Sequence, residues 1–140
     1  MPKGKIINVF VYCAIFALGV LSFYYFERAY EKEQSKVLTL VAEEYFDKKE
    51  YEMATMILNQ AVGKHTGNYI PYYLLGVVYL RVGNDYLALM MLREAINIID
   101  KNKDGAHKYD QEIIIKMIED LEMRSSKSSR SSKEFKGHPS

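Results

Sequence analysis

The sequence has little of what disulfide-stapled or metal-binding domains need. It contains one cysteine, Cys13, three prolines and no tryptophan in 140 residues. A single cysteine can form neither an intramolecular disulfide nor a cysteine-rich zinc site, and Cys13 lies inside an apolar run, where it gives no information on the redox compartment. The three histidines, His65, His107 and His138, are too dispersed along the chain to gather around zinc.

The patterns of the common enzyme classes are also missing from the sequence. We find no Ser, Cys and His set that would share a pocket, no Gly-rich phosphate loop after a strand, and no alternating strand pattern. Residues 27–124 hold 17 acidic and 13 basic side chains, and the resulting net charge of −4 argues against nucleic-acid binding. We therefore expect a helical protein with no enzymatic activity and no cofactor.

An uncharged apolar run occupies residues 6–26, after a basic stub at residues 1–5. As a helix, its 21 residues would extend about 31 Å at about 1.5 Å per residue, which fits a hydrocarbon core about 30 Å thick. Charge returns at Glu27, directly after an aromatic cluster of the kind that favours the membrane interface. That cluster consists of Tyr24, Tyr25 and Phe26. The run predicts a single transmembrane helix.

The nature and direction of this helix have alternatives. Ala17 and Gly19 form a small pair like that of a signal-peptide cleavage site, but the apolar run continues for seven more residues, longer than a usual signal core. Lys3 and Lys5 make the short stub basic without any acid, which favours an N-terminus that stays inside. The rest of the chain would then face the periplasm or an equivalent exterior space.

A spacing of 34 residues recurs after a helical connector at residues 27–34. Shifting the sequence by this period places Tyr45 on Tyr79 and places small residues on small residues. The small positions that align are Ala42 with Gly76, Ala54 with Ala88, and Ala61 with Ala95. Small residues repeated at this period are typical of helical hairpin repeats, because helices that cross at close range leave no room for large side chains.

The aligned residues resemble the tetratricopeptide repeat family. In residues 69–102 the family's pattern of large and small positions is filled by Tyr72, Leu75, Gly76, Tyr79, Ala88, Leu92 and Ala95. Residues 35–68 carry a looser version: Leu38, Val41, Ala42, Tyr45, Ala54, Leu58 and Ala61. Both units lack the family's closing proline and have Thr66 and Asp100 there. An ordinary helical bundle with coincidental small residues is the alternative.

The resemblance implies an all-α fold: an N-terminal transmembrane helix, a two-repeat array of helical hairpins and a C-terminal capping helix. It also implies that the first helix of each repeat lines a concave partner groove. In this register the groove residues are Lys36, Thr39, Leu40, Glu43, Phe46 and Asp47 from the first unit, and Ile70, Tyr73, Leu74, Val77, Leu80 and Arg81 from the second. This largely apolar set predicts an amphipathic helix or an extended apolar segment as the ligand, supplied by a neighbouring subunit or by the chain's own cap.

The C-terminal part is expected to form a loop and a cap at residues 103–124, followed by a tail. A helix from Gln111 to Met123 would have one apolar and one charged face and would cover the open end of the array. Residues 125–140 are Ser-rich, polar and basic, which predicts a disordered tail.

The loop after the second unit resembles the opening of an EF-hand calcium site. Asp100, Asn102 and Asp104 stand at the first three ligand positions, with Gly105 at the turn. The closing bidentate Glu is missing, because Gln111 stands in its place. Asp, Asn and Gly are also ordinary turn formers, so we expect a structural turn without a metal and keep a calcium-responsive switch as an alternative.

Taken together, the apolar run and the repeat pattern predict a membrane-anchored protein–protein interaction module, a scaffold or accessory subunit of a membrane-associated complex. Its partner would be a subunit of that complex or an amphipathic segment, and residues 6–26 would contact the lipid bilayer. A cytosol-facing receptor for targeting segments is the alternative, and it requires the opposite orientation in the membrane.

Overall fold

The computed structural model describes residues 3–102 and 108–135 of the chain. They form five α-helices: α1 (Lys3–Asp47), α2 (Tyr51–Val62), α3 (Ile70–Arg81), α4 (Asp85–Asn102) and α5 (Lys108–Phe135). Within these two ranges there is no β-strand. The expected all-α fold is confirmed.

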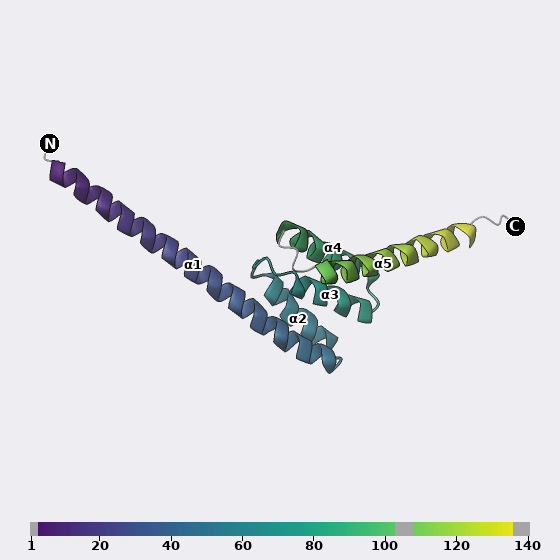
Figure 1. Ribbon diagram of the computed structural model, residues 1–140. Coiled ribbons are helices and arrows are strands. Elements are labelled where there is room, and N and C mark those ends of the chain that lie inside the picture. Colours follow the sequence, from purple (N-terminus) through teal and green to yellow (C-terminus); the bar gives the residue numbers. More distant parts are fainter. Residues whose placement is uncertain (1–2, 103–107, 136–140) are drawn as a thin grey trace.

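Helix α1 carries the apolar run and continues without a break into the packed part of the protein (Figure 1). The stretch after Phe26 in this helix is rich in helix formers and contains neither Gly nor Pro, so its sequence does not interrupt the helix. All side chains from Val9 to Tyr30 are exposed, and Figure 1 shows this half of α1 extending away from the other helices. By length and composition, α1 is able to span a membrane.

The first four helices form two hairpins that pack side by side. α1 packs on α2 and α3 on α4, while α2 also packs on α3 and α4 on α5. The first hairpin shares one buried apolar cluster with α3, and the second shares another with α5. Tyr79 lies against both clusters, so the two hairpins bury a continuous core.

The turns inside the two hairpins have the same backbone hydrogen bonds, 34 residues apart. Lys49 and Gly83 occupy the left-handed region, with φ of 64° and 77°. Each donates its N–H to a carbonyl three residues back, and the next residue donates to a carbonyl five residues back at 2.9 Å. The pairs are Lys49 to Phe46 and Glu50 to Tyr45, then Gly83 to Leu80 and Asn84 to Tyr79. These are the bonds of a Schellman motif, so α1 and α3 end in the same way.

Small residues stand where the paired helices approach most closely. The alanines that align at this spacing are at most 1% exposed: Ala42, Ala54, Ala61, Ala88 and Ala95. At Gly76, a Cβ atom would lie only 2.7 Å from Leu92 Cγ and 2.8 Å from Leu92 Cδ2. Because Leu92 is itself completely buried, α3 and α4 can keep this separation only if position 76 has no side chain.

The correspondence between the hairpins stops in their second helices. α2 ends at Val62 and a loop leads to α3, whereas α4 continues to Asn102. Gly63 follows α2, but α4 has Asn97 at the corresponding place. The following residues of α4 include Ile98 and Ile99, which are buried in the cluster shared with α5. The extra turns of α4 therefore pack against α5.

Helix α5 is longer than the sequence predicts. Instead of Gln111–Met123 it spans Lys108–Phe135, so residues 125–135 are helical where a disordered tail was expected. Ile114 and Leu121 are 1% and 3% exposed and fix the first part of the helix in the core. The serine-rich continuation contains no Gly or Pro, and adding turns to an existing helix avoids the cost of nucleation. Residues 136–140 of the expected tail lie outside the described residues.

Candidate functional site

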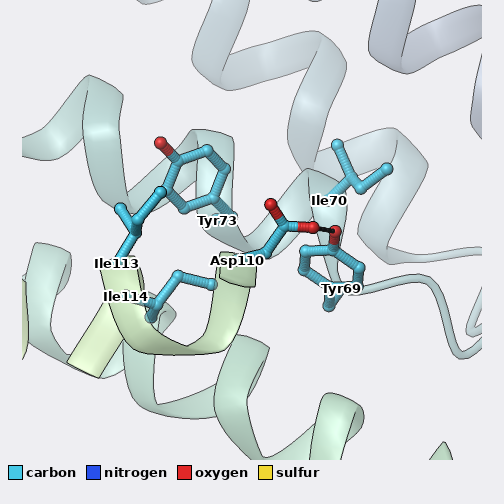
Figure 2. Close-up of a pocket in the computed structure, with 6 residues that line it drawn as sticks. All are labelled: Tyr69, Ile70, Tyr73, Asp110, Ile113 and Ile114. Carbon is cyan, nitrogen blue, oxygen red and sulfur yellow. Dashed lines mark hydrogen bonds between the residues drawn. The ribbon is translucent and has the colours of Figure 1, made fainter. Parts of the chain in front are cut away.

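A cavity of about 220 Å³ lies between the start of α3 and the start of α5. Its walls come from three residues near α3 and three from α5, shown in Figure 2: Tyr69, Ile70, Tyr73, Asp110, Ile113 and Ile114. We call it the α3–α5 cavity. Ile70 and Tyr73 belong to the predicted groove, whereas the α5 residues belong to the region that was expected to cap the array and was one candidate for the ligand of the groove.

The approach to α3 fixes the first wall of this cavity. Asn68 Oδ1 accepts a hydrogen bond from Ile70 N at 3.1 Å, and Pro71 stands in the first turn of the helix, where its missing N–H costs nothing. Tyr69 is thereby placed directly before α3 with its ring in the core, where it is 8% exposed. Its hydroxyl donates to Asp110 Oδ2 at 2.6 Å, across 41 residues of sequence (Figure 2).

The Tyr69–Asp110 pair sets the polarity of the cavity. Burial, and then the hydrogen bond to Asp110, raise the pKa of the Tyr69 hydroxyl well above its ordinary value. Tyr69 is therefore a donor throughout the physiological pH range, and the bond from its hydroxyl holds the Asp110 carboxylate in place. The cavity combines apolar walls with one oriented acceptor, which suits an apolar side chain that lies next to a cation or an N–H group.

A second hollow of about 710 Å³ adjoins the first and is lined by α1, α4 and the loop before α3. Tyr69 and Ile70 belong to the walls of both. The cations that line the second hollow are Arg28, Lys32 and Lys36, so we call it the basic hollow. Asn102 Nδ2 donates to Gly67 O at 3.3 Å and ties the end of α4 to the loop that forms one side of it.

Known proteins offer no guide to these two hollows. Comparison with protein-family models, curated proteins and solved structures finds no match. Their function must therefore be inferred from their geometry and chemistry.

The predicted groove residues fall into three groups. Lys36, Ile70 and Tyr73 line the two hollows. Thr39 is 5% exposed and its hydroxyl donates to Ser35 O at 2.7 Å, which leaves its side chain inside the packed part of α1. The others are exposed or partly buried outside the two hollows: Leu40, Glu43, Phe46, Asp47, Leu74, Val77, Leu80 and Arg81. The α5 side of the cavity has no counterpart in the predicted groove.

Two of the three expected calcium ligands lie in the described part of the chain. Asp100 and Asn102 belong to the last turn of α4. Asp100 Oδ1 accepts a hydrogen bond from Gln111 Nε2 at 2.7 Å, which joins the end of α4 to the start of α5. Asp104 and the glycine at the expected turn, Gly105, lie outside the described residues.

Proposed function

We propose that this chain is a membrane-anchored interaction module of the tetratricopeptide-repeat type, which binds a protein partner at the α3–α5 cavity. The observation that carries the proposal is the combination of an apolar cavity, an oriented carboxylate and a long exposed apolar helix in one chain. Support for the repeat type comes from the matching turns at a spacing of 34 residues and from the buried small residues between paired helices.

The chemistry of the cavity indicates what the partner presents. Ile70, Tyr73 and Ile113 offer apolar surface, and Ile113 is 39% exposed at the wall. Asp110 is the acidic residue among the described lining residues, and because a carboxylate can accept several hydrogen bonds, it can also accept one from a Lys or Arg that lies next to an apolar anchor. The expected ligand is an amphipathic segment, supplied by a neighbouring subunit of a membrane complex.

The anchor fixes where this binding takes place. Because α1 passes without a break from the apolar run into the first hairpin, the module stays close to the bilayer surface. We place the N-terminus inside and the helical domain on the periplasmic or equivalent exterior side. Protease added outside sealed vesicles should leave the C-terminus intact if the C-terminus faces the lumen and should cleave it if it faces outward. The two results distinguish the proposed orientation from that of a cytosol-facing receptor.

Two isoleucines on α5 allow a matched test of the cavity. Ile113 and Ile115 are each 39% exposed, but only Ile113 lines the cavity. We expect Ile113→Asp to reduce co-purification of the partner with the full chain in mild detergent by about 30-fold, the scale of a central interface residue. Ile115→Asp should leave the yield of partner unchanged. Equal yields with the two variants, both folded by circular dichroism, would rule out the cavity as the partner site.

A further inference from the structure

We propose that the basic hollow binds the phosphate group of an anionic lipid headgroup, in the leaflet that the helical domain faces. This goes beyond partner binding at the α3–α5 cavity and rests on α1 lying in the membrane. The inference comes from the charge of the lining residues, their spacing on α1 and their distance from the apolar run.

The hollow concentrates positive charge in a domain that is otherwise net acidic. Arg28, Lys32 and Lys36 recur at four-residue intervals, which places them along one face of α1. Among the described residues that line the hollow, none is acidic. Across the described part of the chain, no carboxylate lies within ion-pair distance of Arg28 or Lys32, while Lys36 pairs with Glu33 at 3.3 Å.

The other walls of the hollow suit a phosphate group. Thr66, Asn68 and Asn102 bring a hydroxyl and two amides to its lining, and these groups can donate hydrogen bonds to phosphate oxygens. An Arg guanidinium can engage two of those oxygens at once, and each Lys adds a point charge. Both the charge and the hydrogen-bonding capacity of the walls therefore match a phosphate ester.

The position of the hollow selects a lipid as the source of the phosphate. At about 1.5 Å per residue, Arg28 lies about 3 Å, Lys32 about 9 Å and Lys36 about 15 Å beyond the end of the apolar run at residue 26. The headgroup region is about 5–8 Å thick on each side of the hydrocarbon core. Arg28 thus lies within the headgroup region, and Lys32 lies at its outer edge. The unbroken helix keeps them there.

The test measures which lipids the full chain retains. The protein is placed in nanodiscs with equal amounts of phosphatidylglycerol and phosphatidylcholine, extracted gently, and examined by native mass spectrometry. Arg28 and Lys32, the two cations without an ion pair in the described part of the chain, should each favour the anionic lipid by about fivefold. We therefore expect about a 25-fold preference for phosphatidylglycerol over phosphatidylcholine. Neutralising all three cations (Arg28→Gln, Lys32→Gln, Lys36→Gln) should bring the ratio close to one.

A charge-matched variant on α5 serves as the control. Lys116→Gln, Arg124→Gln and Lys127→Gln remove the same residue types and the same net charge from exposed positions outside the hollow. This variant should keep the preference of the wild type. If it loses the preference to the same extent, overall charge and not the hollow attracts the lipid, and the proposal is wrong. A wild-type protein that retains both lipids equally also overturns it.

Three further measurements keep the outcome unambiguous. The single variant Arg28→Gln removes only the cation nearest the bilayer, and it should lose about fivefold of the preference while the protein stays folded by circular dichroism. Calorimetric titration of the wild type in phosphatidylcholine nanodiscs with inorganic phosphate tests whether the hollow binds a soluble phosphate instead of a lipid. Saturation at micromolar phosphate would assign the hollow to a soluble phosphate and would contradict the lipid assignment. Ile113→Asp should leave the lipid preference intact. A failure of the partner-binding proposal is therefore distinguishable from a failure of the lipid-binding proposal.

Discussion

Replacing Gly76 by Ala should weaken the contact between α3 and α4. The new Cβ would lie 2.7 Å from Leu92 Cγ and 2.8 Å from Leu92 Cδ2. Nonbonded carbon atoms prefer a separation of about 3.5–4.0 Å. Because Leu92 is 0% exposed, its side chain cannot move into solvent to make room. Either the two helices separate or Leu92 leaves its preferred rotamer.

Two opposing effects determine the size of the change. Overpacking a core costs about 1–3 kcal/mol, whereas Ala is favoured over Gly inside a helix by about 1 kcal/mol. We therefore expect Gly76→Ala to lower the free energy of unfolding by about 1 kcal/mol. The control is Gly63→Ala, where the nearest atom to the new Cβ is Asn59 O at 3.4 Å and the backbone is right-handed helical. This control should be neutral or slightly stabilising.

The decisive comparison is made in a Leu92→Ala background. That truncation costs about 2–5 kcal/mol by itself, but it removes both close atoms, and the third nearest atom to the new Cβ, Ala88 O, lies at 3.4 Å. Gly76→Ala should then stabilise the protein by about 1 kcal/mol, so the sign of its effect reverses. The assay is urea unfolding of the full chain in detergent, followed by far-UV circular dichroism. An equal effect of Gly76→Ala in the two backgrounds would refute the close-contact explanation.

Three further predictions concern the turns, the Tyr69 hydrogen bond and the tail. Lys49→Gly should raise the free energy of unfolding by about 1 kcal/mol, and Gly83→Lys should lower it by a similar amount in the same urea assay, because both positions have positive φ. Tyr69→Phe should cost about 1 kcal/mol at neutral pH. The pKa of Tyr69 is raised in the folded state above its ordinary 10.0, so this hydroxyl stabilises the fold in full below about pH 10 and loses that contribution as the pH rises further. In urea titrations across this range, the free energy of unfolding should fall less steeply with pH for Tyr69→Phe than for the wild type. An equal fall in the two proteins would contradict the raised pKa of Tyr69. Deleting residues 125–140 should leave partner co-purification unchanged, since Leu121 is the last buried residue of α5 among those whose side chains the structure describes, and loss of the partner would make the tail the functional element.

The 34-residue spacing of the sequence recurs in the bounds of the helices. The ends of α1 and α3, at Asp47 and Arg81, and the starts of α2 and α4, at Tyr51 and Asp85, keep the 34-residue spacing. The small residues that mark this spacing are buried between paired helices. Such features are accessible to sequence analysis because small side chains and left-handed turn residues express a local steric requirement.

The cavity depends on a contact that no local pattern encodes. Tyr69 and Asp110 meet across 41 residues, and neither belongs to the positions that repeat at the 34-residue spacing. The amphipathic pattern of the last helix predicts that its Ile114 face is buried, but it does not predict that Asp110 and Ile113 will stand opposite Tyr69. The end of α5 was missed for a related reason: polar sequence without packing partners indicates disorder, yet it can extend a helix whose first turns are already fixed.

Photo-crosslinking in intact membranes tests partner binding at the α3–α5 cavity most directly. A benzoylphenylalanine is introduced at Tyr73, which lines the cavity, or at Tyr86, which does not line it and is 76% exposed. Random encounters would label the protein more from position 86, because that side chain is the more accessible. We predict a discrete protein adduct from position 73 and none from position 86. Adducts of equal yield from the two positions, or an adduct from position 86 alone, would contradict binding at the cavity.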